Sequence, residues 1–206
     1  MIKTLFGNDE FANSYVLCRF DTCVLIDPSH DLAEIMDVIG PKKIEGILIT
    51  HAHSDHVDLI HQFDVPIYIH KDDASLLFED QYNGYAPNKH PYSRKNLKLI
   101  LLEDGQNIKF ADQFIKVIHT PGHTKGSVSF LYQDHLFTGD TLFKESVGRH
   151  DLYSGSLPQL KQSILKLMTL HNDIKIYPGH DELTNMRYEK KNNPFYVKWA
   201  KQFKKL

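Results

Sequence analysis

The stretch GILITHAHSDH, residues 46–56, joins a short apolar run to a group of polar side chains that can bind metal. Residues 46–50 are mostly aliphatic and predict a buried strand, which ends where the polar group begins. The candidate ligands are His51, His53, Asp55 and His56. Because alternate residues of an extended segment point the same way, these side chains can converge without a long loop. The stretch therefore predicts a compact cluster of imidazoles and carboxylates at a strand end.

The donor types in this cluster indicate a catalytic metal site. Imidazole nitrogen and carboxylate oxygen suit zinc, iron and manganese, whereas the cluster lacks the cysteine thiolates that hold many purely structural zinc ions. A site of this kind keeps a coordination position open for water or substrate. We therefore expect catalysis at this position.

Three further candidate ligands each lie beside a glycine that ends a predicted strand. They are His123 in TPGHT (120–124), Asp140 in FTGDT (137–141) and His180 in YPGHD (177–181). Glycine before the polar residue stops the strand and lets the backbone approach a site closely. The candidates are too many for one tetrahedral zinc. They suit two ions that each have three protein ligands and share a bridging carboxylate and a bridging water.

The composition favours one domain that acts on a small molecule. With 206 residues, 41% hydrophobic and 11% aromatic, the chain can bury one substantial core, so we assign residues 1–206 to a single domain. The formal net charge of −2 gives no electrostatic reason to expect nucleic acid or an anionic membrane as a partner. The 13 histidines exceed ordinary usage and direct attention to metals.

The N-terminus and the hydropathy pattern indicate a cytoplasmic protein. Residues 1–7 are followed at once by Asn8, Asp9 and Glu10, so the segment lacks the uninterrupted apolar core of a secretory signal. No later apolar run approaches the length of a membrane span, and we expect no membrane partner. The sequence leaves the oligomeric state open.

Histidines and cysteines outside the motifs are assigned ordinary roles. Cys18 and Cys23 flank a tight connection between two predicted strands and can face each other, but we expect two reduced thiols, because disulfides are rare in the cytosol. The remaining histidines are expected in solvent or in hydrogen bonds: His30, His61, His70, His90, His119, His135, His150 and His171.

Periodicity predicts two similar halves, each with strands followed by a helix. In the first half it predicts strands over 13–20, 23–27, 46–50 and 67–70 and helices over 31–39, 57–63 and 71–78. In the second half it predicts strands over 99–102, 107–110, 113–119, 127–132, 135–137 and 174–177 and helices over 157–170 and 193–206. Residues 79–98 are expected to form a long irregular loop, often a lid or substrate wall. The pattern favours an α/β (α+β) fold, a four-layer αββα sandwich of two mixed β-sheets flanked by helices.

Taken in order, the motifs resemble the signature of the metallo-β-lactamase superfamily. H-x-H-x-D-H, Pro-Gly-His, Gly-Asp after an apolar strand and a final Pro-Gly-His span most of the chain, with Asp27 as the first motif. The resemblance implies that superfamily's αββα fold. It implies a first metal on His51, His53 and His123 and a second on Asp55, His56 and His180. Asp140 would bridge the two ions, and Asp27 would orient a ligand from outside.

Within the superfamily, the chain is similar to the small hydroxyacylglutathione hydrolase (glyoxalase II)-like proteins. The segments TGDTLF (138–143), GRHDL (148–152) and TNMRYEKKNNPF (184–195) each resemble segments of that group. The chain departs from the group at Asp58-Leu59, where a pair of glycines usually stands, and at Tyr153, where a proline is common. We also expect no separate helical substrate domain, since few residues follow His180.

This likeness implies hydrolysis of a small-molecule thioester by a metal-bound hydroxide. The cofactors would be two divalent metal ions, with Zn²⁺ expected and Fe or Mn as alternatives. Asp55 would ligate a metal and also orient the hydroxide. Because a thiolate is a good leaving group, no strong general acid is required. The sequence agrees, since it has no G-x-S-x-G elbow and no catalytic-type cysteine motif.

Other activities share the fold and the ligands. Persulfide dioxygenases share the fold and the Gly-Arg-x-Asp feature, and would place a single iron on His53, His123 and Asp140. Lactonase, lactamase and nuclease activities remain alternatives of lower weight, and the near-neutral charge disfavours nuclease. A non-catalytic binding module would be favoured only if ligands were missing, and none is.

Arg149 is the main candidate for substrate binding. A guanidinium near the bridging ligand can grip a substrate carboxylate through paired hydrogen bonds. The alternative is an internal salt bridge with Asp151, and the sequence does not separate the two.

Overall fold

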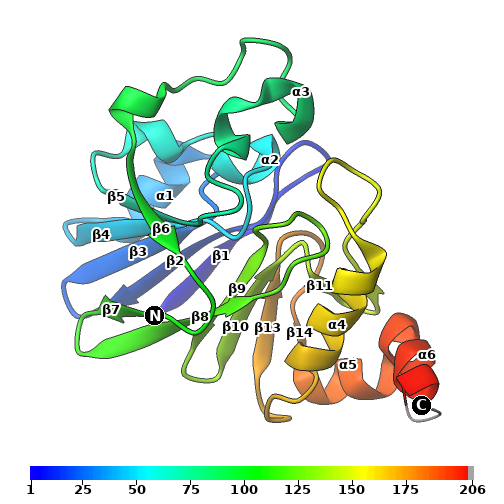
Figure 1. The fold of residues 1–206 in the computed structure, drawn as a ribbon. Helices are drawn as coiled ribbons and strands as arrows, with labels where there is room; N and C mark the ends of the chain where they lie inside the picture. Colours follow the sequence, from blue (N-terminus) through cyan, green and yellow to red (C-terminus); the bar gives the residue numbers. More distant parts are fainter. Residues whose placement is uncertain (204–206) are drawn as a thin grey trace.

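Two six-stranded β-sheets pack face to face and carry helices on both outer sides, which makes a four-layer αββα sandwich (Figure 1). The computed structural model describes residues 1–203. The arrangement confirms the predicted fold class. The first half of the chain forms the first sheet, and the second half forms the second sheet.

The first sheet combines an antiparallel and a parallel part. Its strands in spatial order are β1 (Ile2–Leu5), β2 (Ser14–Arg19), β3 (Thr22–Ile26), β4 (Lys43–Leu48), β5 (Pro66–His70) and β6 (Lys98–Leu102). The pairs β1–β2 and β2–β3 are antiparallel, whereas β3 to β6 run parallel. The parallel strands therefore all end at the same edge of the sheet.

The second sheet is mostly antiparallel. Its strands in spatial order are β14 (Thr184–Asn185), β13 (Lys175–Pro178), β10 (His135–Gly139), β9 (Val128–Tyr132), β8 (Gln113–His119) and β7 (Asn107–Phe110). Only the pair β10–β13 runs parallel among its described pairings. A separate small hairpin is formed by β11 (Leu142–Phe143) and β12 (Ser146–Val147).

Alternating apolar residues fill three interfaces, one between each pair of layers. In β3, Cys23 and Leu25 pack toward helix α1 (Leu32–Ile39), while Val24 and Ile26 pack between the two sheets. On the far side, Leu136 and Ile176 of the second sheet pack against the outer helices α4 (Leu157–Leu167), α5 (Met186–Asn192) and α6 (Pro194–Phe203). Figure 1 shows these three helices, in yellow to red, grouped beside that sheet.

Helices α1, α4 and α5 begin at side chains that satisfy free backbone N–H groups. Asp31 accepts a hydrogen bond from the Glu34 N–H at the start of α1, and Asn185 accepts one from the Tyr188 N–H at the start of α5. The Ser156 side chain accepts a hydrogen bond from the Gln159 N–H at the start of α4. Pro158 lies in the first turn of α4, and its nitrogen carries no hydrogen and needs no acceptor.

Most predicted elements are present, with shifts at their ends. The strands predicted over 107–110 and 113–119 match β7 and β8 to the residue. The strand predicted over 46–50 is β4, which begins and ends earlier, at Lys43–Leu48. The prediction missed β1, the short strands β11, β12 and β14, and helix α5. Of the helix predicted over 193–206, residues 204–206 lie outside the described residues.

Two helix predictions were wrong. The segment 57–63 holds only the end of the one-turn helix α2 (Ser54–Val57) and the 3-10 turn η1 (Ile60–Gln62). The segment 71–78 is a series of turns that ends in η2 (Leu76–Phe78). In both cases apolar spacing comes from short turns that bury single residues, such as Val57 and Ile60, rather than from one continuous helix face.

The expectation of two free thiols was also wrong. Cys18 and Cys23 are directly opposed in the β2–β3 register and form a disulfide. The tight turn between the strands fixes this register and brings the two side chains together on the same face of the sheet. An argument from the cellular compartment alone therefore does not predict the oxidation state of these two cysteines.

None of the helices within residues 1–203 has the length and apolar character needed to cross a membrane.

Candidate metal centre

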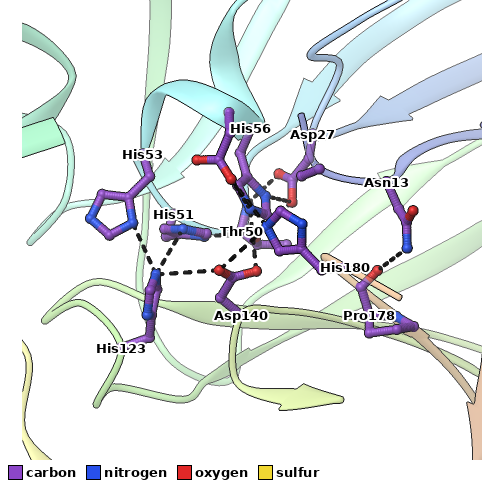
Figure 2. Close-up of polar contacts among 12 residues, drawn as sticks. Asn13, Asp27, Thr50, His51, His53, His56, His123, Asp140, Pro178 and His180 are labelled. Atoms are coloured by element: carbon purple, nitrogen blue, oxygen red, sulfur yellow. Dashed lines mark hydrogen bonds and ion pairs between the residues drawn. The ribbon is translucent and has the colours of Figure 1, made fainter. Parts of the chain in front are cut away.

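The loops that carry the sequence motifs meet at one edge of the sandwich. Asp27 follows β3, His51 comes after β4, His123 after β8, Asp140 after β10 and His180 after β13. Because β3 runs parallel to β4 and β10 runs parallel to β13, the carboxyl ends of these strands lie together. Figure 2 shows the side chains from the two sheets pointing toward one another.

One group of possible ligands consists of His51, His53 and His123. The Nε2 atom of His123 lies 3.2 Å from Nε2 of His51 and 2.9 Å from Nδ1 of His53. The His51 and His53 rings each stand nearly perpendicular to the His123 ring, so their nitrogens converge rather than stack. All three side chains are buried. Three imidazole nitrogens directed at one point can hold one metal ion.

A second group consists of Asp55, His56 and His180. Asp55 and His56 lie on α2, the single helical turn that begins inside the motif. Asp55 Oδ2 lies 3.0 Å from His180 Nε2 and 3.6 Å from His56 Nε2. The prediction that the whole motif is extended was therefore wrong after His53. The helical turn is what directs the second half of the motif to a separate ion position.

Asp140 lies between the two groups. Its Oδ2 atom is 3.5 Å from His123 Nε2 of the first group and 3.7 Å from His180 Nε2 of the second. Its Oδ1 atom is 3.2 Å from His56 Nε2. One carboxylate thus faces both groups, which is the position that a bridging ligand requires.

Unpartnered buried atoms in the cluster fit a bound cation. His56 Nε2 and Asp140 Oδ1 are both buried and have no hydrogen-bond partner, although polar atoms inside proteins are nearly always paired. A divalent metal ion between them satisfies both. The donor set of imidazole nitrogens and carboxylate oxygens is one that zinc, iron and manganese accept.

Asp27 lies outside the cluster and is hydrogen-bonded to His56 and to Thr50. Its Oδ2 atom accepts hydrogen bonds from His56 Nδ1 at 2.8 Å and from the Thr50 hydroxyl at 2.6 Å, and its Oδ1 accepts one from the Thr50 N–H. With the Nδ1 proton of His56 directed at Asp27, the Nε2 lone pair faces the cluster. The Thr50 hydroxyl lies 3.2 Å from Nδ1 of His51 and extends the same network.

The surroundings hold two members of the cluster, His51 and Asp140, in the charge states that bind a metal ion. Burial lowers the pKa of His51 well below its usual value, and the nearby His56 and His123 lower it further. Burial raises the pKa of Asp140, but the combined attraction of His56, His123 and His51 outweighs burial and holds that pKa well below its usual range. At neutral pH the cluster therefore offers an imidazole lone pair on His51 and an ionised carboxylate on Asp140.

A glycine allows the cluster to be this compact. A Cβ atom on Gly179 would collide with the Asp140 carboxylate and would lie 2.7 Å from Cε1 of His56. Only a residue without a side chain lets the loop after β13 pass this close to the two ligands. The predicted role of glycine before His180 is therefore seen in the contacts.

Arg149 contributes through its backbone in this structure. Its carbonyl oxygen accepts a hydrogen bond from His123 Nδ1 at 2.7 Å, which directs Nε2 of that ring into the cluster. Its exposed guanidinium pairs with the Asp151 carboxylate at 2.9 and 3.1 Å. The salt bridge that the sequence left open is thus formed, and the side chain still lines the cavity over the cluster.

Asp73 is a supporting residue that sequence reasoning missed. Its carboxylate is buried and accepts hydrogen bonds from the Ala52 N–H, the Thr124 hydroxyl and the Gly126 N–H. It therefore joins the loop of His51 and His53 to the loop of His123. Its position three residues after β5, in a segment predicted as helix, gave no sign of this role.

Asn13 holds the loop of His180 in a similar way. Its side-chain amide donates to the carbonyl oxygen of Pro178, as Figure 2 shows. The same amide also donates to the carbonyl of Asp181, and the Asn13 N–H donates to the Gly179 carbonyl. The sequence gives no distinct signal for this role, since Asn13 lies just before β2 and is followed by another polar residue, Ser14.

A cavity of about 790 Å³ opens above the cluster. Its floor is formed by members of both ligand groups, among them His53, Asp55, His123, Asp140 and His180. Its walls come from the long loop after β5 and from the segment before α4, as the substrate-wall prediction for residues 79–98 expected. A small organic molecule can thus reach the cluster.

One further group of metal-binding residue types lies elsewhere. His70, Asp72 and His119 bring ligand atoms within 4.8 Å of one another. The two rings are stacked, with centroids 4.1 Å apart and planes 8° apart. This pair joins the end of β5 in the first sheet to the end of β8 in the second.

Sequence comparison finds relatives across nearly the whole chain. The profile of the Metallo-beta-lactamase superfamily matches residues 7–180. An uncharacterized protein of Aquifex aeolicus is 35% identical over 84% of each chain, and a probable metallo-hydrolase of Bacillus subtilis is 31% identical over 89% of this chain and 92% of its own. A hydroxyacylglutathione hydrolase of Francisella philomiragia is 33% identical over 87% of this chain but 67% of its own.

Solved structures agree with the fold. The B3 metallo-beta-lactamase BLEG-1 has a TM-score of 0.87 and 31% identity, over 96% of this chain and 100% of that one. The protein TTHA1623 in a di-iron-bound form has a TM-score of 0.74 and 30% identity, over 94% and 99%. ETHE1 from Myxococcus xanthus, at 23% identity and a TM-score of 0.76 over 98% and 91%, shares the fold.

Proposed function

We propose, because this chain belongs to the metallo-beta-lactamase superfamily, that it is a dinuclear metallohydrolase that cleaves thioesters of small molecules. The hydrolase class follows from the family and from relatives such as the probable metallo-hydrolase of Bacillus subtilis. The thioester is our specific proposal. It is supported by the likeness to the hydroxyacylglutathione hydrolase of Francisella philomiragia and by the glyoxalase II-like segments of the sequence.

The observation that carries the proposal is the presence of two complete ligand groups on either side of one carboxylate. The first group is His51, His53 and His123, and the second is Asp55, His56 and His180. Asp140 faces both, with oxygens 3.2 to 3.7 Å from nitrogens of either group. We propose these seven residues as the metal ligands and Asp27 as the residue that orients His56.

When bound, two divalent ions supply a hydroxide at neutral pH and polarise the carbonyl oxygen of a substrate. The chain's own residues would do the rest. Asp55 lines the cavity and has a carboxylate that can accept a hydrogen bond from the attacking water and so fix its direction. Zn²⁺ is the proposed metal, with iron as the alternative that the di-iron form of TTHA1623 suggests.

The absence of protein groups of other kinds is consistent with this assignment. Within residues 1–203 the cavity over the cluster is lined by no cysteine and no lysine, so its lining offers neither a thiol nucleophile nor an amine nucleophile. A thiolate is a good leaving group, so no side chain in the cavity has to act as a strong general acid during thioester hydrolysis.

The test compares two activities in the same metal-loaded samples. Zinc- and iron-loaded protein at matched metal content is assayed for anaerobic hydrolysis of a 2-hydroxyacyl thioester and for oxygen uptake with a persulfide. We expect thioester hydrolysis without oxygen and no uptake with the persulfide. A β-lactam and a lactone are included, because a B3 metallo-beta-lactamase shares 31% identity with this chain.

Two outcomes would redirect the assignment. Oxygen uptake in the iron form, with negligible thioester cleavage in either form, would favour a mono-iron persulfide dioxygenase on the same fold. Faster turnover of the β-lactam or the lactone than of any thioester would keep the dinuclear hydrolase and replace the substrate class.

A further inference from the structure

The long loop over the cavity is held in place at two points by tyrosines. Tyr85 donates a hydrogen bond from its hydroxyl to the Asp58 carboxylate at 2.9 Å, and Tyr82 stacks on Tyr153. Asp58 and Tyr153 are two of the three residues at which the sequence departs from the glyoxalase II-like pattern, the third being Leu59. Asp58 and Tyr153 each contact a tyrosine of the same loop.

The first attachment fixes the loop directly above the ligand-bearing turn. Asp58 follows helix α2, which carries Asp55 and His56. Gly84 passes so close to this helix that a Cβ atom on it would lie 2.7 Å from the Ser54 hydroxyl, and its φ of +95° suits glycine. The loop at Gly84 thus rests on the turn that carries Asp55 and His56.

The short helix α3 (Asp80–Asn83) inside this loop is fixed from within. Asn83 is buried and donates its side-chain amide to the carbonyls of Leu76 and Leu77. Asp80 accepts a hydrogen bond from the Lys89 N–H and pairs with His90 Nδ1. These bonds leave Tyr82, on α3, in a defined position at the cavity wall.

The second attachment joins this helix to the opposite wall. The rings of Tyr82 and Tyr153 are nearly parallel, with centroids 3.9 Å apart and planes 11° apart. Tyr153 lies in the segment between β12 and α4, which also carries Arg149 and Leu152. Figure 1 shows this segment, in yellow, rising toward α3. Tyr82 lines the cavity, whereas Tyr153 stacks on Tyr82 without lining the cavity, and both residues are partly exposed.

The charges around the cavity disfavour a polyanionic ligand. Among the residues that line it, Arg149 is the only lysine or arginine, and Asp151 already pairs with its guanidinium. Asp80 in the wall is paired with His90. The uncharged residues of the lining are partly aromatic or apolar (Tyr82, Tyr85, Pro87, Phe143 and Leu152) and partly polar (Ser54, Gln81 and Asn83).

We propose that Tyr82, which stacks on Tyr153, is a specificity-determining residue, and that the substrate arm in contact with the Tyr82 ring is apolar or aromatic and carries no charge. Tyr82 would contact that arm, and Tyr153 would act as a positioning residue. The Tyr82 ring attracts another ring or an alkyl group, whereas a carboxylate placed against this ring loses hydration without gaining a charged partner from it. The inference rests on the proposed thioesterase and deepens it by naming a substrate arm.

The experiment measures binding of thiols, as analogues of the leaving group, to the cobalt-substituted protein. Absorption from a thiolate bound to Co²⁺ reports occupancy without any hydrolysis. Benzyl mercaptan serves as the aromatic probe, and mercaptosuccinate and glutathione serve as the charged probes. We expect the wild type to bind benzyl mercaptan at least about tenfold more tightly than either charged thiol at equal pH.

The variants separate contact from general structure. Tyr82→Ala should weaken benzyl mercaptan binding about tenfold and change mercaptosuccinate binding less than about twofold, since only the aromatic contact is lost. Tyr82→Phe should retain the preference. Tyr153→Ala should reduce the preference, and Tyr153→Phe should restore it, because the ring and not the hydroxyl forms the stack. Phe114→Ala, an exposed residue on β8, is the matched control and should change nothing.

Other results would overturn the inference. Equal affinity of the wild type for aromatic and charged thiols, or an equal loss for both in Tyr82→Ala, would remove the specificity role. Steady-state assays then separate the two proposals: hydrolysis of charged thioesters with no aromatic preference leaves the thioesterase standing and rejects this inference. If the protein prefers aromatic thiols but cleaves no thioester, the thioesterase proposal is rejected and the specificity role of Tyr82 remains.

Discussion

The chain gathers histidines with an aspartate in two places, and the two places differ in how the rings meet. In the metal centre, the His51 and His123 rings stand at 87° with centroids 4.6 Å apart. In the other place, the His70 and His119 rings are parallel within 8° at 4.1 Å. Both sites bring ligand-type atoms within 4.8 Å. The two sites therefore have similarly short distances between ligand-type atoms. They differ in the angle between their imidazole rings.

Hydrogen bonds show the same contrast. In the metal centre, the outer nitrogen of His123 is bound to a carbonyl and that of His56 to a carboxylate, so the inner nitrogens face each other. In the stacked pair, His119 Nε2 contacts the Lys125 carbonyl and His70 Nδ1 accepts from the Asp72 N–H. The stacked pair is thus accounted for as a link between the two sheets. Ring orientation and spare nitrogens, rather than residue type, distinguish a metal site.

The largest expected effect comes from removing the carboxylate shared by the two ligand groups. Asp140→Ala should lower metal content at both positions and reduce kcat/KM by about 10³-fold or more, because both ions lose a ligand and the nucleophile is lost with them. His180→Ala should mainly lower the second equivalent. Elemental analysis of reconstituted protein measures both effects, and we expect close to two ions per chain in the wild type.

The stacked pair supplies the matched control for this measurement. His119→Ala should leave metal content unchanged, since the pair is not expected to hold an ion. A loss of metal in His119→Ala equal to that in Asp140→Ala would erase the distinction between the two clusters. Saturation of the wild type at a single ion would contradict the dinuclear assignment.

A smaller effect is expected from the residue that orients His56. Asp27→Asn keeps the size of the side chain but weakens the acceptor for His56 Nδ1 and Thr50. We expect metal affinity to fall about 10- to 100-fold without a large loss of stability. Competition with a chelator measures the affinity, and an affinity within twofold of the wild type would remove Asp27 from the site.

Arg149 should have a modest effect, because its guanidinium is already paired with Asp151. Arg149→Ala should keep metal content and reduce kcat/KM for carboxylate-bearing thioesters by roughly tenfold or less, because an exposed charge-assisted hydrogen bond is lost. Arg149→Lys should restore only part of this loss. If Arg149→Ala leaves the kinetics unchanged, the side chain serves only the salt bridge.

The smallest effect concerns acid stability at the stacked pair. Burial, aided by the neighbouring His119, lowers the pKa of His70 to about 4. Between that value and the ordinary histidine value near 6.5, the unfolded chain binds more protons than the folded one. The stability from neutral His70 is therefore complete above about pH 6.5 and is lost as the pH falls toward 4, on the order of 1–2 kcal/mol.

The measurement compares metal-free wild type with His70→Gln across pH 4–7. The free energy of unfolding should fall less with acid in the variant, because the titrating group is gone. His171→Gln, at an exposed histidine, should keep the wild-type slope. Identical slopes in all three proteins would show that the stacked pair carries no proton-linked stability.

The sequence predicted the fold and the candidate ligands because each is encoded by local pattern. Alternation of apolar residues gave β7 and β8, and glycines before polar residues placed Asp140 and His180 at strand ends. Local pattern failed where short turns imitate a helix face, as in residues 71–78. It also failed for Cys18 and Cys23, where the register of a hairpin outweighed an argument from compartment.

The sequence by itself determined which side chains are candidates for metal binding and at which strand ends they lie. Only the tertiary structure decided how they are supported: Asp73 between two loops, Asn13 under the loop of His180, and Tyr82 against Tyr153. The physical reason is the separation along the chain of the residues that make these contacts. Periodicity and turn residues report a residue's own burial and backbone, whereas these contacts join residues far apart in the chain, and packing of the whole sandwich sets the paths of the loops that bring them together.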